Sequence, residues 1–246
     1  NYINIKSKIF YGQKNSDFSY INSHNSHSKK IIKNFFSKKI KSKLIKINDR
    51  DHNFISKKIK NNYLKLENNL ENLKFVYKIV KKFNISNNQF FKSLKNFKGL
   101  PHRQEKIFSN KNMQIINDSK ATSFKSCYYS LNAFDNILWI LGGIPKNKDD
   151  FFLDKISNKI IKAYIIGKNC LHFKKQLSKK INHQICYNLH NAIEKVVKDI
   201  KSSNNMPCTV LFSPAAASFD QFKNFEDRGQ SFKILIKKKL NLFHNV

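Results

Sequence analysis

One short stretch of the sequence combines a cation, three hydroxyl side chains and the start of a predicted helix. In INDSKATS, residues 116–123, Asp118 and Ser119 end an apolar run, and Lys120 and Thr122 follow. A carboxylate or phosphate placed there would meet helix amino-terminal amides, an ammonium group and a threonine hydroxyl together. The pattern fits equally well an ordinary strand-to-helix turn, in which Thr122 caps the helix and Lys120 is solvated. Because all but three of the 47 basic residues are lysine, residue type alone does not decide between the two interpretations.

Two further polar stretches follow apolar runs later in the chain. LGGIPKNKDD, residues 141–150, leaves a buried run through two glycines and offers Lys146. LFSPAAASFDQFKNFEDRG, residues 211–229, places small residues and Ser218 where a backbone could approach a ligand closely. Nothing in residue propensities explains Ser-Pro-Ala-Ala-Ala-Ser at that position, so a binding site is favoured there over a plain connection. Neither stretch is a P-loop, since the sequence contains no G-x-x-x-x-G-K-[ST].

A fourth candidate, GLPHR at residues 99–103, contributes an arginine and a histidine. Arg103 could clamp a phosphate group with two parallel hydrogen bonds, or it could form a structural ion pair. His102 is expected to be a local hydrogen-bond partner rather than a catalyst.

An alternation of strands and helices would position these stretches. Five apolar segments are typical of strands, at residues 113–117, 136–143, 162–167, 183–187 and 208–213. Apolar spacing predicts helices at roughly 122–133, 150–160, 169–179, 189–202 and 229–240. This alternation indicates an α/β fold with a doubly wound, mostly parallel sheet covered on both faces. In such sheets ligands bind at the carboxyl ends of the strands, and the polar stretches lie there.

The chain before residue 99 is predicted to be a separate unit. Helices are expected at about residues 69–83 and 88–97. Gly99 can end the second helix and Pro101 prevents its continuation. The boundary therefore divides residues 1–98 from residues 99–246.

Residues 1–65 are harder to interpret. They contain short strand-like pieces at residues 8–12, 18–21 and 41–47. His24 and His27 form an HxxH pair, but no Cys or carboxylate stands beside them. A solvated loop is therefore favoured over a metal site.

The formal charge of +31 invites a nucleic-acid-binding interpretation, which the composition weakens. Only Arg50, Arg103 and Arg228 are arginine, the residue preferred for bidentate contacts with phosphates and bases. The lysines are spread along the whole chain and accompany abundant Asn, Ile and Phe, which A/T-rich codons encode. Codon bias therefore accounts for the charge, and no nucleic-acid partner is expected.

Cysteine usage and hydropathy bear on the compartment. Four cysteines are widely spaced and form no CxxC pair, which is typical of reduced thiols in a cytoplasmic protein: Cys127, Cys170, Cys186 and Cys208. No apolar run approaches the roughly 20 residues of a membrane span, and the first residues lack the apolar core of a signal peptide. The chain begins with Asn rather than Met, so we expect a fragment.

Taken together, five stretches of the chain resemble the Mur ligase family, most closely its D-glutamate-adding branch. In order they are NNLEN (68–72), GLPHR (99–103), INDSKAT (116–122), LGG…K (141–146) and SPAAASFDQFKNFEDRG (213–229). The last stretch is the most specific. The resemblance implies a three-domain ligase in which residues 1–98 are the carboxyl-terminal part of the central ATP-binding domain. Residues 99–246 would form its Rossmann-like carboxyl-terminal domain.

The resemblance also implies a reaction. ATP and Mg²⁺ would activate the terminal carboxylate of UDP-N-acetylmuramoyl-L-alanine as an acyl phosphate, which the amine of D-glutamate attacks. This is a cytoplasmic step of peptidoglycan precursor synthesis, and so of cell wall formation, cell shape and cell division. The family's P-loop and Mg²⁺ ligands have no counterpart in the 246 residues, so no catalytic or metal-binding residue is assigned here. We expect the fragment alone to be inactive, and the full-length enzyme to be a monomer without a nucleic-acid or membrane partner.

Family roles carry over to nine residues. ATP is expected to contact Asn72 through its adenine, Arg103 through its phosphates and Asp118 through its ribose. D-glutamate is expected to be bound by six residues of the later stretches: Lys120, Thr122, Lys146, Ser218, Phe219 and Phe225.

The chain departs from the family pattern at two positions and leaves two alternatives open. Asn68 stands where the family usually has His, and Pro145 replaces a small residue before Lys146 and stiffens that loop. One alternative is another Mur ligase or a folylpolyglutamate synthase, against which DQFKNFE argues. The other is a basic nucleic-acid-binding protein, which would explain the charge but none of the five stretches.

Overall fold

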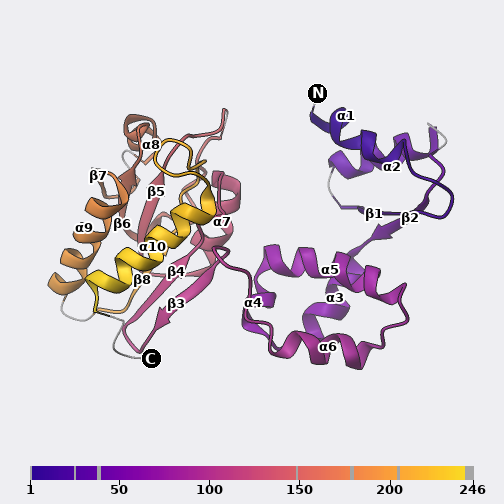
Figure 1. The fold of residues 1–246 in the computed structure, drawn as a ribbon, viewed down its shortest axis with the longest axis horizontal. Coiled ribbons are helices and arrows are strands. Elements are labelled where there is room, and N and C mark those ends of the chain that lie inside the picture. The colour runs from indigo at the N-terminus through magenta and orange to yellow at the C-terminus, as the bar shows by residue number, and fades with distance from the viewer. Residues whose placement is uncertain are drawn as a thin grey trace. The chain divides into compact units, whose positions relative to one another are not determined.

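The chain folds into two compact units, which divide between Lys98 and Gly99 (Figure 1). We call residues 1–98 unit 1 and residues 99–246 unit 2. The computed structural model describes residues 2–24, 26–37, 40–147, 149–177, 180–203 and 206–241.

Unit 2 is built on a six-stranded sheet of order β3-β4-β8-β5-β6-β7. Its strands are β3 (Glu105–Ser109), β4 (Met113–Asn117), β5 (Ile137–Gly142), β6 (Ile160–Ile166), β7 (His183–Tyr187) and β8 (Cys208–Phe212). Every neighbouring pair is parallel except β3 with β4. The prediction of a mostly parallel α/β sheet is confirmed, and β3 is an antiparallel edge strand that the sequence analysis missed.

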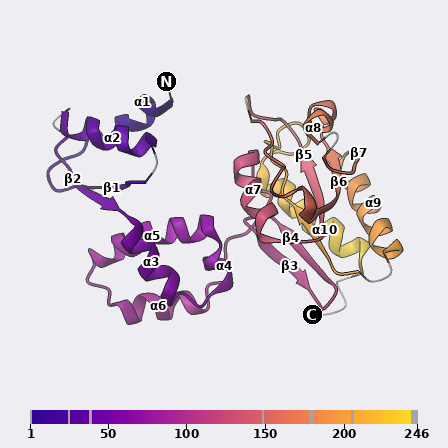
Figure 2. The same cartoon turned by 180° about the vertical axis from the view of Figure 1, so that it is seen from behind.

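Helices cover both faces of this sheet, as predicted. They are α7 (Phe124–Ala133), α8 (Cys170–Leu177), α9 (Leu189–Ser202) and α10 (Phe225–Lys239). Alternate side chains of β5 point to opposite faces, so that Trp139 packs with α7 and α8 while Ile140 packs with α9 and α10. All six residues of β5 are buried, which explains its continuous apolar run. Helix α10 crosses in front of the sheet in Figure 1 and behind it in Figure 2.

The prediction of a helix at residues 150–160 is wrong. Only Ser157–Lys159 is helical there, as a short 3₁₀ helix. Leu153 and Ile156 are fully buried in the core beneath α7 and α8, and the ring of Phe151 stacks on that of Phe124 at 4.2 Å between centroids. The apolar spacing therefore reflects an irregular segment that fills the core.

Two helices begin at positions other than those predicted. Ser123, not Thr122, is the N-cap of α7, because its hydroxyl accepts a hydrogen bond from Ser126 N. Helix α10 begins before the predicted residue 229, because the Asn224 side chain caps it by accepting a hydrogen bond from Asp227 N at 2.7 Å. Both starts are set by a capping side chain that the sequence pattern did not identify.

Unit 1 combines helices with a two-stranded parallel sheet. In chain order its elements are α1 (Tyr2–Ser7), the 3₁₀ helix Lys8–Phe10, β1 (Phe18–Asn22), α2 (Ser26–Ser37), β2 (Lys43–Ile47), α3 (Asp49–Lys58), α4 (Asn62–Lys65), α5 (Glu67–Lys81) and α6 (Asn87–Lys95). Strands β1 and β2 confirm two predicted strand pieces, and α5 and α6 confirm the two predicted helices. The strand piece predicted at residues 8–12 is wrong, because that segment forms the 3₁₀ helix and a turn. A buried cluster that includes Ile55, Leu70 and Phe90 holds α3, α5 and α6 together.

Candidate functional site

Three loops leave the carboxyl ends of three adjacent strands of unit 2. Loop A (residues 118–122) follows β4, loop B (residues 143–147) follows β5, and loop C (residues 213–219) follows β8. Because β8 lies between β4 and β5 in the sheet, the three loops are neighbours along one edge. The polar stretches predicted from the sequence to share a sheet edge therefore do so.

Loops B and C are joined by main-chain hydrogen bonds. Ile144 N donates to Ala217 O and Ala217 N donates to Ile144 O, both at 2.9 Å. This contact requires glycine at position 143, because a Cβ placed there would lie 2.2 Å from Ala217 O. Gly143 also has φ +134°, a conformation that other residues rarely adopt. The glycine pair thus allows loop B to lie directly against loop C.

A buried arginine on α10 joins loops A and C. Arg228 Nε donates to Ser119 Oγ (3.1 Å), Nη2 donates to Ser119 O (2.8 Å) and Nη1 donates to Ala216 O (3.0 Å). The side chain is almost fully buried, and this burial lowers the pKa of Arg228 to about 10, while Asp220 acts in the opposite direction. No role for Arg228 was predicted from the sequence, although one signal was available. Where the composition favours lysine so strongly, an arginine indicates that the guanidinium itself is needed.

The cations and hydroxyls predicted to bind D-glutamate lie on this edge with different exposures. Lys120 and Lys146 are both exposed, and neither forms an ion pair with a residue that the structure describes. Thr122 is half-buried and Ser218 is buried in loop C. The edge therefore presents two cations and two hydroxyl residues, which suits an anionic ligand.

The two predicted phenylalanines lie differently. Phe219 is 71% exposed. The part of this residue assigned to the site is therefore its main chain rather than its ring. Phe225, the first residue of α10, is half-buried, and its ring lies under the ammonium group of Lys120.

Asp118, predicted to contact the ATP ribose, is buried at the base of loop A. Its carboxylate accepts hydrogen bonds from Ser130 Oγ (2.6 Å), Ser213 Oγ (2.8 Å) and Gln104 N (3.2 Å). Burial raises the pKa of Asp118 to about 6, although the two serine hydroxyls, Gln104 N and nearby Arg103 act in the opposite direction. With three protein donors on its carboxylate, Asp118 holds loop A to loop C and to the segment after Arg103.

His102 is a hydrogen-bonding residue of the fold, as predicted. Its Nδ1 lies 2.8 Å from Asn117 Nδ2, and its carbonyl oxygen accepts from Lys120 N at 2.9 Å. Burial lowers the pKa of His102, with Lys233 acting in the same direction and Glu105 in the opposite one. His102 therefore fixes the backbone of loop A beside the predicted boundary.

The other two residues assigned to ATP are accessible. Arg103 in unit 2 is half-buried, and Asn72 on α5 of unit 1 is exposed. Their assignment stays a prediction. The side chain of Asn68, the first departure from the family pattern, lies outside the described residues.

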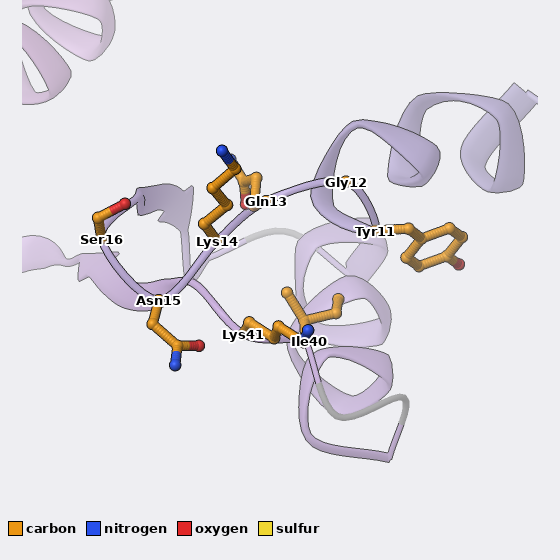
Figure 3. Close-up of a pocket in the computed structure, with 8 residues that line it drawn as sticks. All are labelled: Tyr11, Gly12, Gln13, Lys14, Asn15, Ser16, Ile40 and Lys41. Carbon is orange, nitrogen blue, oxygen red and sulfur yellow. The ribbon is translucent and has the colours of Figure 1, made fainter.

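One pocket among the described residues lies in unit 1. It has a volume of about 720 Å³ and lies beside the loop from Tyr11 to Ser16, with Ile40 and Lys41 on its other side (Figure 3). None of the described residues that line it is a carboxylate, histidine or cysteine. Size alone does not make it a site, and the described lining lacks the side chains that most often bind metal ions in proteins.

The HxxH pair does not indicate a metal centre. His24 Nε2 lies 3.1 Å from Asp49 Oδ1, and His27 is in α2 rather than in the predicted loop. Within the described parts of the chain, no group of three or more His, Cys, Asp or Glu residues could hold a metal ion. Nor is any helix of those parts both long and apolar enough to cross a membrane.

Comparison with curated proteins gives a clear sequence relative, while no model of a known protein family matches the chain. The chain is 34% identical over 251 aligned positions to the UDP-N-acetylmuramoylalanine–D-glutamate ligase of Rickettsia felis. The alignment spans 96% of this chain and 56% of that protein. The chain thus covers about half the length of the curated relatives it matches.

Comparison with solved structures gives the same fold. One is the UDP-N-acetylmuramoylalanyl-D-glutamyl-2,6-diaminopimelate–D-alanyl-D-alanyl ligase of Acinetobacter baumannii, with a TM-score of 0.61 and 10% identity over 96% of this chain and 54% of that one. Another is the folylpolyglutamate synthase of Mycobacterium tuberculosis, with a TM-score of 0.61 and 12% identity over 94% of this chain and 58% of that one. At such low identity these two likenesses concern the fold alone.

Proposed function

This chain belongs to the Mur ligase family, and we propose that it is part of an enzyme that joins D-glutamate to UDP-N-acetylmuramoyl-L-alanine. ATP would drive the reaction by phosphorylating the terminal carboxylate of the UDP-linked substrate. The amine of D-glutamate would then attack the acyl phosphate, which forms the amide and releases phosphate. The chain covers 56% of its relative, so this activity concerns the whole ligase rather than the 246 residues alone.

The observation that carries the proposal is the joining of loops A, B and C along one sheet edge. Loop C is hydrogen-bonded to loop B through Ile144 and Ala217, and to loop A through Arg228. D-glutamate carries two carboxylates, and Lys120 and Lys146 would supply one cation from each flanking loop. A hydrogen bond to a charged group contributes about 1.5–3 kcal/mol. Two cations held on hydrogen-bonded loops would therefore favour an amino acid with two carboxylates over one with a single carboxylate.

The hydroxyls and the loop backbone would complete the amino-acid site. Thr122, one residue before the α7 cap, and Ser218, buried in loop C, are the assigned hydroxyl donors. The main chain at Phe219 would form the remaining wall. Fixed donors of this kind orient the amine for attack at little entropic cost.

ATP would be bound by residues of different kinds. Arg103 and Asn72 are accessible side chains that suit a phosphate and an adenine respectively. Asp118 fits a ribose contact less well, because its carboxylate is buried and already accepts three protein hydrogen bonds. We therefore assign Asp118 an indirect role, in which it holds the loops in place. Mg²⁺ is assigned to no residue of this chain.

We place the reaction in the cytoplasm, as a step of peptidoglycan precursor synthesis carried out by a monomeric ligase. All four cysteines are free thiols, which suits a reducing compartment. ATP and a UDP-linked substrate are supplied there as well.

An amino-acid panel tests the proposal. The ligase that contains this chain is incubated with ATP and UDP-N-acetylmuramoyl-L-alanine, and phosphate release and amide product are followed with D-glutamate, L-glutamate, D-alanine and 2,6-diaminopimelate in turn. We expect product with D-glutamate alone. Preference for another amino acid, or for a folate in place of the UDP-linked substrate, would assign the chain to another ligase of the same fold.

A further inference from the structure

The ammonium group of Lys120 lies directly over an aromatic ring. Lys120 Nζ is 3.7 Å from the ring centroid of Phe225, well within the roughly 6 Å over which a ring attracts a cation. Lys120 belongs to loop A, and Phe225 begins α10. The two residues are distant in sequence, so the tertiary fold alone brings them together.

Composition by itself produces some such contacts, because the chain is rich in both Lys and Phe. Other stacks among the described residues are longer, from 4.0 Å for Lys82 over Phe18 to 6.0 Å for Lys58 over Phe91. The Lys120 contact is the shortest of those described.

Buried hydrogen bonds fix the backbone on both sides of this contact. Ser119 Oγ donates to Phe225 O at 2.8 Å, which joins the residue before Lys120 to the residue that supplies the ring. Arg228 binds the same serine, and Lys120 N donates to His102 O at 2.9 Å. The backbones of loop A and of the first residue of α10 are therefore held together beside this contact.

A stack of this kind reduces the freedom of a flexible side chain. An exposed lysine loses much rotamer entropy when a ligand immobilises it, and an ammonium group already confined loses less. In the described part of the chain Lys120 has no ion pair that could confine it instead. Lys146, the other assigned cation, lies over no described ring.

We propose that Phe225 is a positioning residue, whose ring holds the Lys120 ammonium group where a carboxylate of the amino-acid substrate binds. The role rests on the proposed function and refines it, because the ring of Phe225 acts on the amino-acid site through Lys120. A ring that confines a cation at a partly exposed site changes ligand affinity by about two- to fivefold.

A double-mutant cycle in the intact ligase tests this role. Phe225→Leu, Lys120→Ala and the double variant are compared with wild type for the KM of D-glutamate and for kcat. Phe225→Tyr keeps the ring and should restore the KM. Phe152→Leu replaces an exposed phenylalanine of unit 2 outside the loops and serves as the matched control. Thermal unfolding of each variant checks that the fold is retained.

We expect Phe225→Leu to raise the KM of D-glutamate about two- to fivefold with little change in kcat, and to have no further effect once Lys120 is alanine. Phe225→Tyr and Phe152→Leu should both stay close to wild type. An equal effect of Phe225→Leu with and without Lys120 would overturn the positioning role while leaving the proposed function intact. If Lys120→Ala itself leaves the KM of D-glutamate unchanged, Lys120 is not in the site and the positioning role fails, whereas the proposed function is decided separately by the amino-acid panel.

Discussion

Arg228 donates hydrogen bonds to both the hydroxyl and the carbonyl oxygen of Ser119, and its third nitrogen reaches loop C at Ala216. No carboxylate accepts a hydrogen bond from this buried guanidinium among the described residues. A charge so deeply buried is costly unless its donors are satisfied, and here two main-chain carbonyls and one hydroxyl accept from its three nitrogens. The relative position of loops A and C therefore depends on the planar, three-sided geometry of arginine.

Arg228→Lys should destabilise unit 2 although it keeps the charge. An ammonium group cannot reach Ser119 and Ala216 in the directions that a guanidinium does, so we expect a loss of about 2–4 kcal/mol in the free energy of unfolding. Urea unfolding followed by Trp139 fluorescence measures it, because this single tryptophan is buried in β5 of unit 2. Arg103→Lys, at a half-buried arginine of the same unit, is the control and should cost under about 0.5 kcal/mol. Equal losses for the two variants would show that Arg228 has no special role.

Gly143→Ala should separate loops B and C. The added Cβ would lie 2.2 Å from Ala217 O at a backbone angle that alanine rarely adopts, so the hydrogen bonds between Ile144 and Ala217 must break. We expect a loss of about 2–4 kcal/mol by the same fluorescence measurement. Gly12→Ala is the matched control, since a Cβ there meets nothing within 4 Å. An unfolding midpoint for Gly143→Ala equal to that of wild type would contradict the close approach.

Asp118 should make the stability of unit 2 fall as pH rises. Its pKa is about 6 in the folded chain and 3.8 in its ordinary environment, so the folded state binds the proton more tightly. The stabilisation from that proton is fully present below about pH 3.8 and is lost as pH rises through about 6. Compared with wild type, Asp118→Asn should therefore gain roughly 2–3 kcal/mol in relative stability between about pH 4 and pH 7.

Urea unfolding of the two proteins across that pH range measures the difference. Asp150→Asn, at an exposed carboxylate of unit 2, serves as the control for the loss of one acidic group. A pH-independent difference between Asp118→Asn and wild type would mean that burial does not perturb the carboxyl group of Asp118.

The architecture of unit 2 follows from features that a sequence displays directly. A strand such as β5, buried on both faces, must be apolar throughout, and α9 must bury one side, so both leave a readable pattern. Strand β3 was missed because an antiparallel edge strand needs neither a continuous nor a strictly alternating apolar pattern. Its residues, from Glu105 to Ser109, are at most half-buried.

The helix prediction for residues 150–160 failed for the opposite reason. Phe151, Leu153 and Ile156 are apolar because they fill the core, and their spacing resembles a helix without one being formed. Regular spacing of apolar residues indicates which side chains are buried. It indicates a helix only where the backbone is itself regular.

The candidate site was predictable in part. Its loops could be located, because polar residues after buried strands stand out and a parallel sheet brings its carboxyl ends together. The contacts that hold the loops could not be predicted, because they join residues that are far apart in the chain. Examples are the hydrogen bond between Arg228 and Ser119 and the contact between Lys120 and Phe225. The burial of Asp118 and its hydrogen bonds from Ser130 and Ser213 likewise depend on the packed fold.

The claim that loops A, B and C bind D-glutamate is tested most directly by comparing two lysines of one chain. Lys120 stands at the carboxyl end of β4, whereas Lys111, also exposed, precedes the same strand at its other end. In the intact ligase, Lys120→Ala should raise the KM of D-glutamate about tenfold to a hundredfold, as the loss of one charge-assisted hydrogen bond requires. Lys111→Ala should leave the KM within about twofold of wild type, as expected for a surface change away from the site. An unchanged KM for Lys120→Ala, or equal increases for both variants, would contradict the assignment of the site.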